Sequence, residues 1–220
     1  DMLAKLVSIL SLRRQYEQKK LNRIASLKET AAQRQTDEGR LWDYTQLYED
    51  YFTYDSDSAN KYVDLNIEIA QRLNNTNLET EWNIKKAQLL VNTGLMGPAL
   101  EMAAEIRPCV DKEHLVDYYN LMFAAYFRMS QYADGSSQVQ KNYSKTCLQY
   151  RDSIMLYIRS NDPDYLRFKV GDVKTPKQIE DMIATFENEL SKSSLSTRQD
   201  AMNAMTLANL YQRVHNTDKY

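Results

Sequence analysis

Apolar residues recur every three or four positions through most of the chain, which is the spacing of one face of an α-helix. One such stripe lies within residues 1–10, and a second runs through residues 21–31 in the same register. Charged residues at 13–20 interrupt the stripe between them. The pattern predicts a long helix or a helix pair over residues 2–35, which bends near its middle or docks its two ends on different partners.

A second pattern repeats with a fixed offset of 40 residues. The pairs that share this offset are Trp42 with Trp82, Leu47 with Ala87, and Ala59 with Ala99. An offset shared by several positions indicates an internal repeat, in which each unit buries its apolar face by stacking on its neighbours.

The second copy has the spacing of a tetratricopeptide helical hairpin. Ala87 and Leu90 stand at the small and large positions of its first helix, where a small residue allows close approach of the partner helix. Gly94 is expected to end that helix, and Ala99 to lie where the second helix crosses the first. Pro98 suits the first turn of the second helix, because the missing N–H has no partner there in any case.

Later copies repeat these positions less regularly. In the third copy, Ala124 and Phe127 are the small and large residues. In the fifth, Leu207, Ala208 and Tyr211 match the signature of a first helix, and Ser196 or Thr197 is expected to cap it. The chain ends at Tyr220, before the second helix of this hairpin would begin, so we expect it to be a piece of a longer protein.

The fold class predicted is all-α, a right-handed superhelix of tetratricopeptide-like hairpins preceded by a long N-terminal helix. We expect a single domain over 1–220. Its parts are the N-terminal helix at 1–38 and hairpins at 40–75, 79–108, 115–160, 163–191 and 196–220, the last incomplete. The five Gly and four Pro agree with long helices joined by short turns.

Charge modifies this picture locally. The chain has a net charge of −2, which gives no reason to expect a nucleic-acid or anionic-membrane partner. Residues 1–40 carry nine basic and five acidic side chains (+4), whereas residues 41–80 carry two basic and eight acidic ones (−6). This contrast indicates either attraction between the N-terminal helix and the first repeat, or two separately solvated faces. No apolar run reaches the ~18 residues of a membrane span.

Candidate chemistry is sparse, and the sequence predicts a protein that is not an enzyme, without cofactor, metal or catalytic residues. The two histidines, His114 and His215, lack neighbouring metal ligands, and no nucleotide-binding or hydrolase motif occurs. The acidic run at 55–58 is interpreted as a helix cap rather than half of a calcium loop. Cys109 and Cys147 are either a disulfide pair or, as we favour, buried thiols.

Two sets of side chains could form a peptide-binding groove. Tyr44, Tyr48 and Phe52 share a helix face, and they line a groove or belong to the core beneath the N-terminal helix. Polar residues at matching positions of later repeats are the better candidates for the concave binding face: Gln88, Asn92, Arg128, Asn209 and Arg213.

Two stretches carry a family resemblance, YEQKKLNRIASLKETAAQRQTDEGRLWDYTQLYEDYFTYDSDSANKYVDLNIEIAQRL and AMNAMTLANLYQRVHNTDK, together with the long third hairpin. The chain resembles the N-terminal tetratricopeptide sensor region of membrane-anchored transcriptional regulators of Bacteroidota. The resemblance implies a location at the periplasmic face of the inner membrane, with a membrane helix and a cytoplasmic DNA-binding domain outside this chain. It implies that this region itself binds no nucleic acid.

We therefore expect a protein- or ligand-binding sensor domain that acts in signal transduction. Binding along the concave face, or homodimerisation through the N-terminal helix, would change the arrangement passed to the membrane. The alternative is a tetratricopeptide scaffold or co-chaperone-like module for assembling protein complexes. A protein or peptide partner is expected under both interpretations.

Overall fold

The structure is a computed structural model that describes the backbone of residues 2–135, 137–193 and 198–217. Side chains are described for the same residues except 2–13, 198 and 215–217. The described residues form ten α-helices and two short 3-10 helices, with no β-strand among them. The prediction of an all-α fold is confirmed. The caps expected at Ser196 or Thr197 lie outside the described residues.

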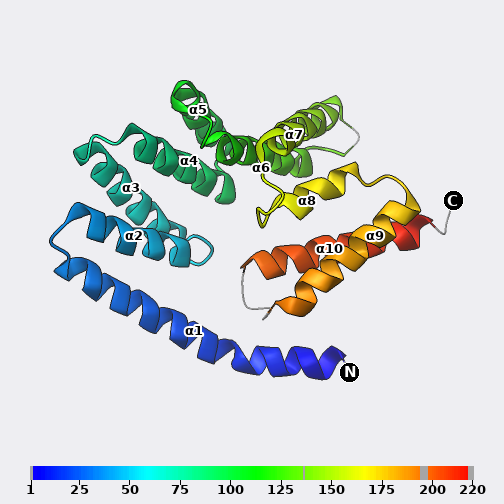
Figure 1. Cartoon of the computed structure of the whole chain (residues 1–220), viewed down its shortest axis with the longest axis horizontal. Coiled ribbons are helices and arrows are strands. Elements are labelled where there is room, and N and C mark those ends of the chain that lie inside the picture. Colours follow the sequence, from blue (N-terminus) through cyan, green and yellow to red (C-terminus); the bar gives the residue numbers. More distant parts are fainter. Residues whose placement is uncertain (1, 136, 194–197, 218–220) are drawn as a thin grey trace. The chain divides into compact units, whose positions relative to one another are not determined.

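The chain divides into two compact units, residues 1–147 and 148–220, with the division inside α7. Figure 1 labels the helices of both units. The helices begin and end as follows: α1 Met2–Gln33, α2 Asp37–Tyr51, α3 Ser56–Arg72, α4 Thr76–Asn92, α5 Met96–Ile106, η1 Arg107–Cys109, α6 Leu115–Tyr132, α7 Gln138–Tyr157, α8 Tyr165–Lys169, η2 Val170–Asp172, α9 Pro176–Lys192 and α10 Arg198–Thr217. In unit 1, consecutive helices from α1 to α5 pack against one another, and α6 packs against both α4 and α5.

Short turns with well-made caps connect the helices of unit 1. The Asp55 carboxylate accepts the backbone N–H groups of Asp57 and Ser58 at the start of α3, which confirms the capping interpretation. After α4, Gly94 adopts a φ of 88°, the left-handed conformation that costs glycine little. Its neighbour Leu95 donates its N–H to the carbonyl of Leu90, which closes a Schellman motif and ends α4 as expected.

The turn between α3 and α4 uses asparagine for the same purpose. Asn74 has a φ of 52°, and the N–H of Asn75 reaches the carbonyl of Ala70 at 3.0 Å. Asn tolerates this conformation better than other non-glycine residues. The Asn75 side chain then accepts the N–H of Leu78 and caps α4. One short segment therefore ends α3 and begins α4.

The 40-residue repeat is reflected in burial at two of its three pairs. Leu47 and Ala87 are both fully buried, and so are Ala59 and Ala99. The third pair differs, because Trp82 is 2% exposed whereas Trp42 is 57% exposed. Trp82 packs edge-on against Tyr48 of the preceding hairpin, with ring centroids 5.4 Å apart. Trp42 has no equivalent hairpin before it, because α2 is preceded by the single helix α1.

The expected small and large positions are wrong in two later repeats. In α6, Leu121 and Ala125 are in the core, whereas Phe127 is 49% exposed. In α10, the residue packed fully against α9 is Leu210, and Ala208 and Tyr211 lie at the surface. The apolar face of each helix is rotated relative to the repeat signature, because the neighbouring helix decides which residues are buried.

Opposite charges join α1 and the turn after it to α2, so the structure supports attraction, the first of the two interpretations of the charge pattern. Arg23 pairs with Asp50 at 3.1 Å, and Arg34 pairs with Asp43 at 2.8 Å. Between these two ion pairs, Ile24 belongs to the core that α1 shares with α2 and α3. Packing and charge thus stabilise the same interface.

Unit 2 has its own small core between α9 and α10, centred on Phe186 and Leu210. A buried arginine, Arg151, joins the unit-2 end of α7 to η2. Its guanidinium donates to the carbonyl of Phe168 at 3.0 Å and pairs with Asp172. The Arg151 side chain lies against Gly171, where a Cβ would be 2.7 Å from Nε.

Candidate functional site

Two of the predicted groove residues meet in unit 1. The Arg128 guanidinium on α6 donates a hydrogen bond to the side-chain oxygen of Asn92 at the end of α4, over 3.2 Å. Gln88 lies one turn earlier on α4, and all three side chains are half-buried. Helices α4 and α6 pack directly against each other, and this contact joins Asn92 to Arg128 across their interface.

Two aromatic residues, the half-buried Phe123 and the exposed Phe127, adjoin Arg128 in the sequence of α6. Phe123 and Phe127 stack with ring centroids 6.1 Å apart and planes 15° from parallel. Arg128 has no carboxylate partner among the described residues, although an arginine carries five donors. The site, defined here as the Asn92–Arg128 site, thus combines an unneutralised guanidinium with apolar surface. It can accept an anionic or amide group beside an apolar one.

The remaining predicted residues belong to unit 2. Asn209 is exposed on α10. Arg213, one turn further along α10, donates to the backbone carbonyl of Val173 between η2 and α9. That guanidinium therefore has a structural contact within unit 2.

The aromatic face of α2 contributes to the core. Tyr48 is 5% exposed, and its hydroxyl donates to the carbonyl of Lys85 at 3.2 Å. Tyr44 packs against Tyr62, and Phe52 against Tyr48. Of the two interpretations left open by the sequence, the structure supports the one that places these rings in the core.

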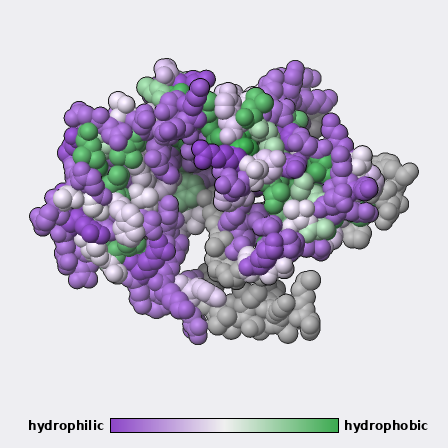
Figure 2. Space-filling view, viewed as in Figure 1, coloured by the Kyte–Doolittle hydropathy of each residue, from purple (hydrophilic) through white to green (hydrophobic). Residues whose placement is uncertain are grey.

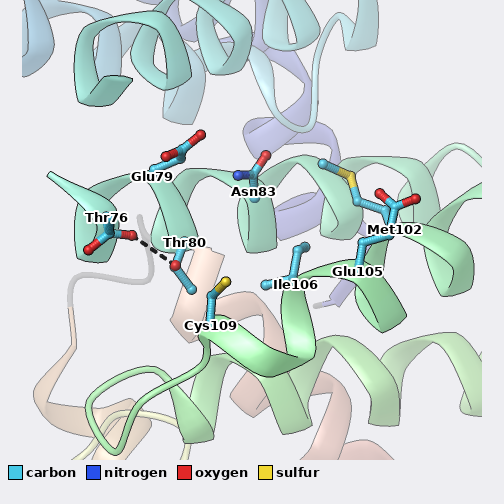
Figure 3. Close-up of a pocket in the computed structure, with 8 residues that line it drawn as sticks. All are labelled: Thr76, Glu79, Thr80, Asn83, Met102, Glu105, Ile106 and Cys109. Carbon is cyan, nitrogen blue, oxygen red and sulfur yellow. Dashed lines mark hydrogen bonds between the residues drawn. The ribbon is translucent and has the colours of Figure 1, made fainter. Parts of the chain in front are cut away.

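A pocket of about 440 Å³ lies between α4 and α5, at the end where η1 follows α5 (Figure 3). It is lined by Thr76, Glu79, Thr80, Asn83, Met102, Glu105, Ile106 and Cys109. Figure 3 shows Glu79 and Asn83 on α4, and Met102, Glu105 and Ile106 on α5. A polar stripe at helical spacing in α4 could have indicated this surface, but sequence reasoning missed it.

The pocket contains carboxylates and no cationic group. Ile106 is 7% exposed and Met102 is half-buried, so part of the lining is apolar. The Thr80 hydroxyl is already used, because it donates to the carbonyl of Thr76. Glu79 accepts a hydrogen bond from Gln71 of α3 at 2.7 Å.

A smaller pocket of about 300 Å³ lies in unit 2. It is lined by Lys169, Asp172, Val173, Gln178, Asp181, Met182 and Thr185. Several of these groups have structural roles: Asp172 pairs with Arg151, and Gln178 completes the capping box of α9. Its lining carries charges of both signs, so no single ligand chemistry is favoured.

Both cysteines are free thiols. Cys147 is buried as expected, whereas the expectation is wrong for Cys109, which is exposed at the end of η1. Burial raises the pKa of the Cys147 thiol to about 11. Among the described residues, no group of three His, Cys, Asp or Glu side chains could hold a metal ion. Across the same part of the chain, no helix is both long and apolar enough to span a bilayer.

The visible surface offers no broad apolar face. Figure 2 shows a mostly hydrophilic face with hydrophobic residues in small separate groups. The candidate surfaces are therefore local: the Asn92–Arg128 site and the pocket between α4 and α5.

Comparison with known proteins gives one result that covers almost the whole chain. No curated protein and no solved structure gave a significant match. The family profile of the SusR N-terminal TPR domain matches residues 10–220. That range includes helices of both units, from most of α1 to α10. The chain therefore belongs to the SusR N-terminal TPR domain family.

Proposed function

We propose that this chain is the non-enzymatic sensor domain of a transcriptional regulator, and that it acts in signal transduction by binding a protein or other ligand. The observation that carries the proposal is the match of residues 10–220 to the TPR domain of SusR-type regulators. Stacked helical hairpins present side chains from successive helices on a common surface, which suits them to binding.

The Asn92–Arg128 site is the place in unit 1 where we expect binding. Asn92 fixes one nitrogen of the Arg128 guanidinium, so less side-chain entropy is lost when a ligand binds the remaining donors. Phe127, 49% exposed, supplies apolar contact area beside this charge. Arginine and aromatic residues carry much of the energy at protein interfaces.

Substitution in the complete regulator tests this proposal. Arg128→Glu is expected to abolish the response of a reporter gene to its inducing signal, because the site then repels the group that Arg128 attracts. Lys141→Glu makes the same change of charge on the exposed surface of α7 and should leave the response intact. An unchanged response in Arg128→Glu, at equal protein levels, would remove this site from the signalling mechanism.

A periplasmic location and attachment to the membrane through a segment outside this chain are part of the proposal. They rest on the resemblance to membrane-anchored regulators. Fusing alkaline phosphatase after Thr217 of this chain, in the protein encoded by the complete native gene, tests them, because that enzyme is active only after export. Inactive fusions, with active cytoplasmic controls, would favour the alternative of a cytoplasmic scaffold for protein assembly.

A further inference from the structure

The pocket between α4 and α5 has an unbalanced charge. Its lining includes two carboxylates, Glu79 and Glu105, and no Lys, Arg or His. Within the described part of the chain, neither carboxylate forms an ion pair. A pair of unneutralised carboxylates beside a cavity attracts a positive group, most strongly where the surroundings exclude water.

Neighbouring cations are engaged elsewhere. The Arg107 guanidinium lies 5.5 Å from the ring centroid of Tyr118. Lys85 pairs with Glu81 at 3.3 Å, and Lys86 with Asp64 at 2.7 Å. These contacts hold the basic side chains of α4 and η1 on other surfaces, so the charge of the pocket is left for a ligand.

The lining of the pocket also combines apolar and acidic groups, as a long cationic side chain requires. Met102 and the buried Ile106 provide apolar surface, and Glu79 and Glu105 project from different helices. Lysine and arginine place their methylene stems on apolar surface while the charged end binds acceptors. A volume of about 440 Å³ lies within the ~300–1,000 Å³ of ordinary ligand pockets.

We propose that this pocket binds a lysine or arginine side chain of a protein partner, with the stem on Met102 and Ile106 and the cation attracted by the negative charge of Glu79 and Glu105. This interaction rests on the proposed role in binding a protein, and it adds a second contact. The pocket starts at Thr76, whereas the Asn92–Arg128 site lies at the other end of α4. Thirteen residues of helix, about 20 Å, separate Glu79 of the pocket from Asn92.

The exposed thiol of Cys109 allows the charge preference to be measured inside the pocket. The 220-residue chain is equilibrated with cystamine, hydroxyethyl disulfide or dithiodipropionic acid, which leave a cationic, neutral or anionic group on the cysteine. Intact mass gives the yield of each adduct. Cys147 is buried with a raised pKa, so it should not react.

The cationic adduct is expected to form about tenfold more favourably than the anionic one. Glu79→Gln with Glu105→Gln should remove this preference. The matched control is Glu101→Gln with Glu113→Gln, which deletes two exposed carboxylates outside the pocket and should retain it. Equal yields in the wild-type chain, or equal loss in both double variants, would overturn the proposal.

Peptide binding tests the protein partner directly. A fluorescent peptide that alternates Lys and Leu should bind at least about tenfold more tightly than the same peptide with Gln for Lys. Added salt and the Glu79→Gln, Glu105→Gln variant should both weaken binding. Equal affinities of the two peptides would refute the lysine contact. Self-association lost only in that variant would identify a second copy as the occupant instead.

These measurements also separate the two proposals. They use the isolated chain and vary only pocket residues, whereas Arg128→Glu is scored by reporter output in the complete regulator. If the pocket experiment fails but Arg128→Glu abolishes the reporter response, the proposed sensor function stands. If Arg128→Glu leaves the reporter response unchanged, the adduct yields at Cys109 still test the pocket on their own.

Discussion

The guanidinium of Arg34 lies 2.8 Å from the carboxylate of Asp43, which is completely buried in α2. Arg34 is in the turn that follows α1, so this pair joins the N-terminal helix to the first hairpin. The hydrogen bonds that Arg34 donates to Asp43 raise the pKa of Arg34 above its ordinary value. A buried carboxylate is tolerated only while such a partner is present.

Arg34→Met should therefore lower the melting temperature by several degrees, because Asp43 is left buried without its cation. Arg34→Met combined with Asp43→Leu should be less destabilising than Arg34→Met alone, since the desolvated charge is then gone. Thermal unfolding followed by circular dichroism measures both. A double variant no more stable than the single one would show that the pair is needed for its geometry rather than its charge.

Asn66 of α3 is completely buried, and neither polar atom of its amide has a hydrogen-bond partner among the described residues. An unsatisfied buried amide costs stability, whereas an apolar side chain of similar shape does not. Asn66→Leu should therefore raise the free energy of unfolding by about 1 kcal/mol.

Urea unfolding of the wild type and the variant checks this value. Asn60→Leu is the matched control, because Asn60 already donates to Asp64 and its replacement should bring no gain. A destabilised Asn66→Leu protein would mean that the amide has a role in fixing how α3 packs.

Gly171 and Arg151 should behave as a coupled pair. A Cβ at position 171 would lie 2.7 Å from Arg151 Nε and 2.8 Å from Cζ. Since the guanidinium is held by Phe168 and Asp172, it cannot move aside freely. Gly171→Ala should cost about 1–3 kcal/mol of stability.

A double-mutant cycle with Arg151→Met checks the cause, because the shorter neutral side chain relieves the clash. Gly97→Ala is the control: a Cβ there meets nothing within 4 Å, and the change removes a glycine from a helix. It should be neutral or stabilising. Additive effects of Gly171→Ala and Arg151→Met would exclude the steric explanation.

Acid should lower the free energy of unfolding of unit 1, because three of its carboxylates have lowered pKa values in the folded state. Hydrogen bonds from Arg72 lower the pKa of Asp37, and the Ser58 hydroxyl and backbone N–H lower that of Asp55. The hydrogen bond with His114 lowers the pKa of Asp111. A folded-state pKa below the unfolded one contributes stability that is present above the unfolded pKa, near 4, and lost as pH falls through the folded pKa.

Asp37→Asn tests one of these contributions. The loss of stability between pH 7 and pH 2.5, measured by urea unfolding, should be smaller in the variant than in the wild type, because Asp37 no longer takes up a proton. Glu101→Gln replaces an exposed carboxylate of α5 and serves as the control. An identical pH profile for Asp37→Asn and the wild type would contradict the contribution of the Asp37–Arg72 pair.

Much of the first two hairpins could be predicted from the sequence, because small residues and turn residues there have strong local effects. Gly94 and the Asp55 cap end and begin helices through their own backbone preferences. The exposure of Phe127 and Trp42 does not follow from the repeat pattern, because it depends on which helix lies opposite, and that is decided by tertiary packing.

The candidate site shows the same limit. Asn92 and Arg128 are 36 residues apart, and the repeat register placed them on a common surface where they form a hydrogen bond. Glu79 and Glu105, in contrast, do not stand at equivalent positions of the repeat. The polar stripe of α4 marks one wall of their pocket, but the position of the other wall, where η1 follows α5, is decided by tertiary packing.

The turns at Asn74 and Gly94 have a mechanical consequence. Because each turn is made of backbone hydrogen bonds and leaves no spare residues, rotation of α4 about its axis cannot be absorbed by a loop at either end. Twist applied at α4 would pass to α3 and α5 together. A ligand that rotates α4 would thus move α3, α4 and α5 together.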